Sequence, residues 1–318
     1  MSRIYEALQK AEAERKPERR EREPLMPVQS DGVAAVAEPS LATAVAEYVP
    51  FTPEAAEVFS ASLPMTVSGS ALDLSKIVKR PWTPSLMQLP ALLERGPAVE
   101  QFRSLRSRIH ELRDISPLKS ILVSSGLPQE GKSFISTNLA ISLARHKSSK
   151  VLLIDGDMRR YTLHELLGCE SQPGLADYLA VKAGLEEIMQ QAEQAPEENM
   201  PGKAFLPNLT FIAGGNGGDK AADLSGNPRF GELIKMAAPY FDWIIVDSSP
   251  VLPVSDAVNL SRSCDGVLLV ARGGVTKFPV AQRAASELKS ANLLGFVLNA
   301  VLDKPQVGSY YGYDATKD

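Results

Sequence analysis

The segment 124–133 constrains the fold more than any other part of the chain, because it places two glycines, a lysine and a serine at the spacing of a phosphate-binding loop. It matches the pattern Gly-x-x-x-x-Gly-Lys-Ser. Apolar residues 121–123 before it predict a buried strand, and apolar residues at helical spacing within 134–143 predict a helix after it. A Walker A loop requires this order of strand, loop and helix. The segment therefore predicts a nucleotide site.

The glycines, the lysine and the serine of the loop each have a predicted role. Gly126 and Gly131 let backbone N–H groups turn toward phosphate oxygens, and the start of the following helix adds its positive dipole end. Lys132 is predicted to reach the β- and γ-phosphates, and the Ser133 hydroxyl to bind Mg²⁺. The alternative, a glycine-rich turn without function, does not explain why every pattern position and both flanking elements match.

The composition sets limits on the class of protein. The 318 residues leave room for one large domain or two small ones, and a formal net charge of −4 gives no global reason to expect a nucleic-acid partner. Apolar runs fall far short of the roughly 20 residues that cross a bilayer, and the first residues lack a signal-peptide core. Cys169 and Cys264 are expected to be small buried residues in a reducing cytoplasm.

The N-terminal part is predicted to be a flexible extension. Residues 1–23 predict a helix with Ile4 and Leu8 on one face, either fully solvated or docked on a partner that would stabilise it. Residues 24–94 are predicted to be a largely disordered linker, because 24–64 is rich in proline and has no lysine or arginine. Within 65–94 the prediction stays open, since several apolar residues could pack on the domain: Ile77, Trp82, Leu86, Leu89 and Leu92.

The segment 99–113 predicts a helix, since its apolar residues recur at spacings of three and four. Glu100, Arg103 and Arg106 form a charged stripe beside that apolar face. Two interpretations stay open. The stripe could make ion pairs within the helix, each worth about 0.2–0.5 kcal/mol, or Glu100 could meet an arginine of a neighbouring subunit.

From residue 120 onward, apolar runs alternate with helical segments. This alternation predicts an α/β domain of the P-loop NTPase type over residues 95–303, with a mostly parallel sheet, helices on both faces and ligands at the carboxyl ends of the strands. The predicted strands are 121–123, 151–154, 209–212, 243–246, 267–270 and 296–298, and the predicted helices are 163–167, 175–179, 185–192, 229–237 and 280–288.

Three aspartates lie at predicted strand ends. Asp247 is in the Walker B position, where a carboxylate would hold Mg²⁺ through its water shell. Asp155 and Asp157 follow the strand 151–154 and could both face a metal. A phenol of pKa near 10 is about 0.1% ionised at pH 7, so a carboxylate that takes its proton would assist phosphoryl transfer to it. Either aspartate could be that base or a metal organiser; alternatively, the pair holds water and caps the next helix.

The C-terminal segment 304–318 supplies a possible phosphoryl acceptor. Tyr310, Tyr311 and Tyr313 lie within four positions, among glycine and serine residues that disfavour a stable fold. Such a tail could reach an active site, its own or a neighbour's. A packed or adhesive tail is the alternative, and composition alone favours it.

These motifs resemble those of the bacterial tyrosine kinases of capsule and exopolysaccharide synthesis, of the cytoplasmic type with no fused membrane domain. The resemblance covers roughly residues 95–313. The family's Pro-x-Glu-Gly-Lys-Ser segment matches at 128–133, and its second motif, three aliphatic residues and Asp-x-Asp-x-Arg, matches at 152–159. In the Walker B motif Asp247 and Ser248 match, but Ser249 replaces the first proline of the usual Pro-Pro pair. Asp256 and the stripe on 99–113 also match.

The resemblance implies a protein-tyrosine kinase that uses ATP and Mg²⁺. Its tail tyrosines Tyr310, Tyr311 and Tyr313 would be phosphorylated in trans, and its stripe of Glu100, Arg103 and Arg106 would build the oligomer. The implied catalytic residues are Lys132, Asp155, Asp157 and Asp247; the Mg²⁺ ligands Ser133, Asp157 and Asp247; and the nucleotide-binding residues Gly126, Pro128, Glu130, Gly131, Lys132, Ser133, Phe134, Arg159, Arg272 and Asn299.

The resemblance also implies an assembly and a place in the cell. A ring-shaped homo-oligomer would form and fall apart as phosphate accumulates, and so regulate polysaccharide polymerisation and export. A separate membrane protein of the polysaccharide co-polymerase type would activate this cytoplasmic kinase and recruit it to the inner face of the plasma membrane. No nucleic-acid partner and no membrane span of its own are implied.

Two alternatives belong to other functional classes. Partitioning or positioning switch ATPases share this fold, but they carry a lysine at the position of Leu127 and generally lack a tyrosine tail. A pseudokinase scaffold that binds ATP and forms rings is the second alternative, because Ser249 and the short tyrosine cluster leave room for weak catalysis.

Overall fold

The computed structural model describes residues 72–146, 148–193, 206 and 208–301. The predicted helix over 1–23, most of the predicted linker and the tyrosine segment lie outside these residues. In the described part, eight strands form one sheet in the order β1-β4-β5-β3-β6-β2-β7-β8. The strands are β1 (Val78–Arg80), β2 (Ser120–Ser125), β3 (Val151–Asp155), β4 (Met189–Ala192), β5 (Leu209–Ile212), β6 (Trp243–Asp247), β7 (Gly266–Arg272) and β8 (Leu293–Asn299).

The sheet is parallel throughout except between β4 and β5. Its central strands β2, β3 and β6 are buried along their whole length. A strand that is covered on both faces needs apolar residues in succession, and these strands have them. The predicted mostly parallel sheet is therefore confirmed.

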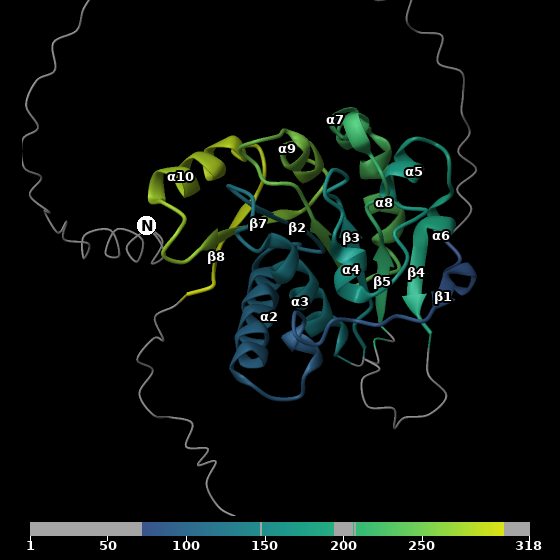
Figure 1. The fold of residues 1–318 in the computed structure, drawn as a ribbon, viewed down its shortest axis with the longest axis horizontal. Coiled ribbons are helices and arrows are strands. Elements are labelled where there is room, and N and C mark those ends of the chain that lie inside the picture. Colours follow the sequence, from purple (N-terminus) through teal and green to yellow (C-terminus); the bar gives the residue numbers. More distant parts are fainter. Residues whose placement is uncertain (1–71, 147, 194–205, 207, 302–318) are drawn as a thin grey trace, which may run out of the picture. The chain divides into compact units, whose positions relative to one another are not determined.

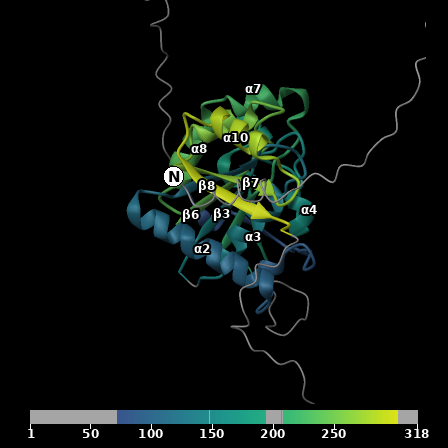
Figure 2. The same ribbon diagram turned by 90° about the vertical axis from the view of Figure 1, so that its left-hand side faces the viewer.

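Helices lie on both faces of the sheet, as Figures 1 and 2 show for α2 and α3 below it and α7 and α10 above it. Side chains of α2 and α3 share one core with Ile121 and Leu153, and side chains of α8 and α9 share another with Leu122 and Leu152. The helices are η2 (Leu74–Lys76), η3 (Pro90–Leu92), α2 (Pro97–Ile115), α3 (Lys132–Ala144), α4 (Leu163–Leu167), α5 (Leu175–Leu179), α6 (Leu185–Ile188), η4 (Gly218–Lys220), α7 (Ala221–Ser225), α8 (Arg229–Ala237), α9 (Asp256–Ser261) and α10 (Phe278–Glu287).

The prediction of one helix over 185–192 is wrong in its second half. The helix α6 ends at Ile188, and Met189 begins strand β4. Residues 189–191 pair with β5 on one side, and residues 190–192 pair with β1 on the other. Hydrogen bonds to two distant strands outweigh the weak local preference of Met, Gln and Ala for a helix.

The packed domain begins before residue 95, so the end of the predicted linker needs correction. Strand β1 forms an edge of the sheet, and Ile77, Trp82 and Leu89 are buried. The Trp82 ring meets Phe211 of β5 edge to face, with ring centroids 6.2 Å apart. The domain therefore extends at least to Leu72. No helix in the described ranges is long and apolar enough to cross a membrane.

We expect Trp82→Ala to lower the free energy of unfolding by about 3–5 kcal/mol, the usual cost of removing a large buried aromatic side chain. Urea unfolding of the full chain, followed by circular dichroism, measures this. Met87→Ala is the matched control, because Met87 lies in the same segment and is 98% exposed; its effect should stay within about 0.5 kcal/mol. Equal effects of the two substitutions would contradict the assignment of this segment to the domain.

Candidate nucleotide-binding site

The sheet order brings the predicted site residues to one edge. Strand β6 lies between β3 and β2, and Asp155 at the end of β3 stands in register with Asp247 at the end of β6. The loop that follows β2 leads directly into α3. The P-loop and the aspartates of the two neighbouring strands therefore lie together at the carboxyl ends of the strands, as predicted.

The backbone of the P-loop requires glycine at position 131. Gly131 has φ of 95°, a conformation that side chains disfavour, and it stands immediately before α3. A Cβ atom there would lie 1.9 Å from Nδ2 of Asn299 at the end of β8. The Asn299 amide donates a hydrogen bond to the Glu130 carbonyl at 3.0 Å. Asn299, predicted to bind nucleotide, thus packs directly against the loop.

The Glu130 carboxylate braces the loop from within. One of its oxygens accepts from the Leu127 backbone N–H at 2.8 Å, and the other is hydrogen-bonded to the Thr276 hydroxyl. The Thr276 hydroxyl also accepts from the Arg272 backbone N–H at 2.8 Å. The carboxylate is buried. These contacts show that Glu130 shapes the loop, and that the segment after β7 takes part. The sequence did not indicate Thr276, since no motif marks it.

A buried ammonium group lies among carboxylates at the centre of the site. Lys132 Nζ is 3.0 Å from Asp157 Oδ2 and 3.6 Å from Asp247 Oδ2. Burial by itself lowers the pKa of Lys132, but Asp247, Asp157 and Asp155 outweigh this, and the pKa lies above its ordinary value. Lys132 is therefore positively charged at neutral pH. Its ammonium group is held by Asp157 and Asp247, two of the predicted Mg²⁺ ligands.

Two hydroxyl groups of α3 reach Asp247. The Ser133 hydroxyl donates to Asp247 Oδ2 at 2.7 Å, and the Ser136 hydroxyl donates to Oδ1 at 3.1 Å. Burial raises the pKa of Asp247, while Lys132 and Ser133 oppose the shift. Ser136 was missed by the sequence reasoning; its one signal is a small polar residue three positions after Ser133.

Asp155 differs from Asp157 in its surroundings. Both Asp155 oxygens accept backbone N–H groups, from Asp157 at 3.2 Å and from Leu163 at 3.1 Å. The side chain is completely buried, and burial together with Asp247 raises its pKa well above the ordinary value. Asp157 instead directs Oδ2 at Lys132. Asp155 thus fixes the loop after β3, and Asp157 faces the P-loop.

Arg159 is anchored by Asp256 at the start of α9. Its Nε lies 2.7 Å from Asp256 Oδ2, and this hydrogen bond raises the pKa of Arg159. Asp256 is buried. The pair joins the loop after β3 to the segment after β6, at the same edge of the sheet as the P-loop.

The donor set fits Mg²⁺. A serine hydroxyl and two aspartate carboxylates are hard oxygen ligands, and Mg²⁺ in nucleotide sites takes one or two carboxylates, substrate phosphates and waters. Within the described ranges, no group of three or more His, Cys, Asp or Glu side chains could hold a metal ion by itself. The predicted ligands Ser133, Asp157 and Asp247 are therefore suited to a metal that arrives with a nucleotide.

A groove of about 490 Å³ opens beside Ser133. Phe134, predicted to touch nucleotide, forms part of its wall together with Leu166, and polar groups line the rest. The full lining is Ser85, Gln88, Ser133, Phe134, Thr162, Glu165 and Leu166.

The charged stripe lies on α2, away from the P-loop. Arg103 pairs with Glu100 one turn earlier, which is the intrahelical ion pair weighed from the sequence. Arg106 does not join the pair and donates to the Ser142 carbonyl at 2.8 Å. The subunit contact of the stripe and the tail tyrosines stay predictions.

Comparison with known proteins finds tyrosine kinases similar to this chain in sequence and fold, although no family model matches. The tyrosine-protein kinase YwqD of Bacillus subtilis is 34% identical over 221 residues, which cover 69% of this chain and 87% of that protein. The tyrosine-protein kinase ptk of Acinetobacter johnsonii is 32% identical over 206 residues, 64% of this chain and only 26% of that longer protein. The solved kinase domain of Escherichia coli ETK has a TM-score of 0.60 at 30% identity and covers 71% of this chain and 85% of that domain. The predicted P-loop fold is confirmed.

We expect Asp155→Asn to stabilise the nucleotide-free chain more at pH 8 than at pH 5. A raised pKa means that the folded state disfavours the ionised carboxylate, so its contribution to stability is lost as pH rises above about 4, the unfolded value. The substitution also removes one hydrogen-bond acceptor of Asp155. The cost of that loss does not depend on pH, so it cancels when the change in unfolding free energy is compared between the two pH values. Urea unfolding at fixed salt with a metal chelator measures it, with Glu111→Gln as an exposed control. A difference that does not change with pH would refute the prediction.

Proposed function

The chain belongs to the family of bacterial tyrosine kinases, and from this premise we propose that it transfers the γ-phosphoryl group of ATP to tyrosines of its own C-terminal segment, Tyr310, Tyr311 and Tyr313. The observation that carries the proposal is that Asp157 and Asp247 both meet the P-loop lysine Lys132, while Asp247 also accepts a hydrogen bond from the P-loop serine Ser133. A transfer reaction of this kind needs positioned charges more than covalent chemistry.

In this proposal, Lys132 leaves Asp157 and Asp247 to bind the β- and γ-phosphates, which the P-loop N–H groups also hold. Bound Mg²⁺, held by Ser133, Asp157 and Asp247, would neutralise phosphate charge. Asp157 takes the phenol proton as the tyrosine oxygen bonds to phosphorus and the bond to ADP breaks. Asp155 positions the loop, since both its oxygens are occupied by backbone N–H groups.

The groove beside Ser133 is the place we propose for the acceptor ring. It adjoins the P-loop serine, and its wall of Phe134 and Leu166 offers apolar contact to a phenol ring. We propose that Arg272 and Asn299, at the ends of β7 and β8, contact the nucleotide and its adenine base on the side of the P-loop away from this groove.

The assembly and location are proposals that rest on the family resemblance. We propose a ring-shaped homo-oligomer joined through Glu100, Arg103 and Arg106, activated and brought to the inner face of the plasma membrane by a membrane protein of the polysaccharide co-polymerase type. From the cytoplasm, the kinase would then control polymerisation and export of an exopolysaccharide.

A scaffold that binds ATP without transferring phosphate is the second candidate. Ser249 replaces a family proline, and its buried hydroxyl has no hydrogen-bond partner.

Incubation with Mg-ATP should produce phosphotyrosine in the C-terminal segment, detected by intact-mass and peptide mass spectrometry. Lys132→Met should lower it by about 100-fold or more, as expected when a charge that stabilises the transferring group is lost. Lys182→Met is the control for an exposed lysine, and a Tyr310/Tyr311/Tyr313→Phe variant should remain unmodified there. ATP turnover without phosphotyrosine, even beside the membrane activator, would favour the switch-ATPase or scaffold alternatives.

The triple variant Glu100→Ala with Arg103→Ala and Arg106→Ala should lower the oligomer mass measured by light scattering toward that of one chain. Arg108→Ala with Glu111→Ala is the matched control, because that ion pair lies on the same helix and is exposed. An unchanged mass in the triple variant would contradict the subunit contact and leave the stripe as an ion pair within α2.

A further inference from the structure

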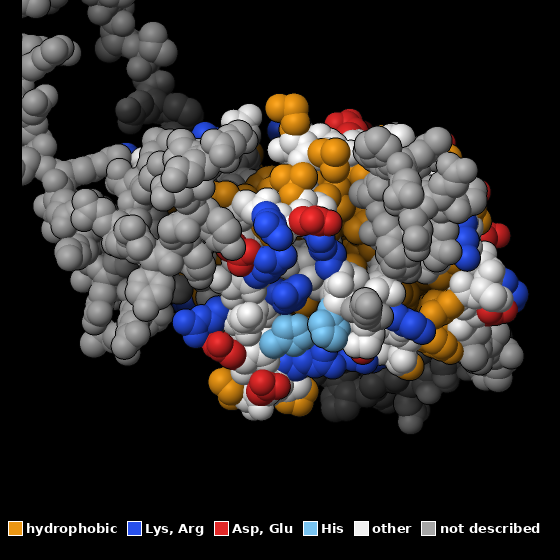
Figure 3. Space-filling view, turned by 90° about the horizontal axis from the view of Figure 1, so that it is seen from below, with side chains coloured by type: hydrophobic (Ala, Val, Ile, Leu, Met, Phe, Trp, Pro, Cys, Tyr) orange, Lys and Arg blue, Asp and Glu red, His pale blue; other side chains and the backbone are white. Residues whose placement is uncertain are grey.

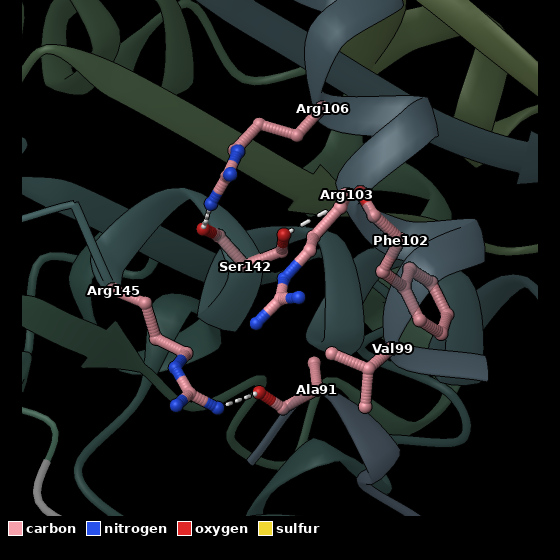
Figure 4. Close-up of a pocket in the computed structure, with 7 residues that line it drawn as sticks. All are labelled: Ala91, Val99, Phe102, Arg103, Arg106, Ser142 and Arg145. Carbon is pink, nitrogen blue, oxygen red and sulfur yellow. Dashed lines mark hydrogen bonds between the residues drawn. The ribbon is translucent and has the colours of Figure 1, made fainter. Parts of the chain in front are cut away.

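A pocket of about 180 Å³ lies between α2 and the C-terminal end of α3, and three arginines line it. Figure 3 views the face of the domain that carries α2, where basic side chains gather, and Figure 4 shows Arg103, Arg106 and Arg145 around the pocket. Val99 and Phe102 form its apolar wall. The pocket is distinct from the P-loop site, because α3 has 13 residues and separates its two ends by about 20 Å.

The positive charge of this pocket is not balanced by carboxylates among the described residues. Arg103 pairs with Glu100, but Arg106 and Arg145 reach only backbone carbonyl groups, of Ser142 and of Ala91 and Leu93. Burial and the charges of Arg103 and Arg145 lower the pKa of Arg106, which still leaves it protonated. The partial negative charge at the end of α3 offsets less than one of these charges.

The lining favours one kind of anion. Guanidinium groups bind phosphate through two parallel hydrogen bonds, and each still has N–H donors beyond those used for the carbonyls. The wall of Val99 and Phe102 can cover an aromatic ring attached to that phosphate. A phosphotyrosine carries about −1.5 to −2 charges at pH 7, which complements the two unpaired arginines. A carboxylate side chain supplies less charge and no ring.

We propose that Arg103, Arg106 and Arg145 form a phosphotyrosine-binding pocket, and that its occupant is a phosphorylated tyrosine of this chain's own segment 302–318. This segment lies outside the described residues and carries Tyr310, Tyr311 and Tyr313. The origin of the phosphate rests on the proposed function, but the binding itself does not. Because Arg103 and Arg106 also belong to the proposed subunit contact, a bound phosphotyrosine and a neighbouring subunit would compete for the same guanidinium groups.

The test is titration of a peptide with the sequence of residues 304–318, phosphorylated at Tyr311, into the full chain purified free of phosphate. A saturating non-hydrolysable Mg-ATP analogue fills the γ-phosphate position and keeps the phosphorylated tyrosine out of the proposed transfer site, and isothermal calorimetry measures the dissociation constant. We expect Arg106→Gln and Arg145→Gln each to weaken binding by about tenfold or more, the typical loss of a charge-assisted hydrogen bond. Arg145→Lys, which keeps the charge but not the planar fork, should be intermediate.

Three controls make the result decisive. Arg108→Gln on the same helix, whose side chain is 78% exposed, should bind like the wild type. The unphosphorylated peptide and inorganic phosphate should each bind at least about tenfold more weakly than the phosphopeptide. Equal binding of either, or equal loss with Arg108→Gln, would overturn the assignment. Because no transfer step takes part, binding can succeed or fail independently of kinase activity; thermal unfolding of each variant confirms that it is folded.

Discussion

One buried charge arrangement governs the edge of the sheet where the site lies. Lys132 lies within 3.6 Å of carboxylate oxygens from two different strand ends. An unpaired ammonium or carboxylate in such a place would cost several kcal/mol, so the three groups depend on one another. That dependence requires β2, β6 and β3 to be adjacent, which the observed strand order provides. A nucleotide with Mg²⁺ would replace one set of compensating charges by another.

The P-loop is braced from the opposite half of the sheet. Thr276, after β7, and Asn299, at the end of β8, both hydrogen-bond to Glu130, and Asn299 fills the space that a side chain at Gly131 would need. The chain leaves β8 only two residues before the described part ends at Val301. The proposed acceptor tyrosines, Tyr310, Tyr311 and Tyr313, follow in sequence 11 to 14 positions after Asn299.

Short sequence patterns were enough to predict the features that depend only on neighbouring residues. The P-loop, Asp155 and Asp247 could be placed because each stands at the end of a short apolar run, and parallel strands bring such ends together. Strands β1 and β4 could not, since they exist only through pairing with each other and with β5, more than a hundred residues after β1. Thr276 could not be predicted for the same reason, because its hydrogen-bond partner Glu130 is 146 positions away in the sequence.

The helix α3 runs between the proposed transfer site and the proposed phosphotyrosine pocket. Its N-terminal part supplies Lys132, Ser133 and Ser136 to the proposed transfer site, and its last turn supplies the Ser142 carbonyl that accepts from Arg106. Two arginines of the pocket, Arg103 and Arg106, belong to the stripe proposed for subunit contact, so a phosphate bound to them draws on the same N–H donors. Accumulating phosphotyrosine would therefore compete directly for the groups that join subunits. Repulsion between phosphorylated tails would act in the same direction, but salt screens it beyond about 10 Å, whereas a phosphotyrosine in the pocket would compete for the proposed contact itself.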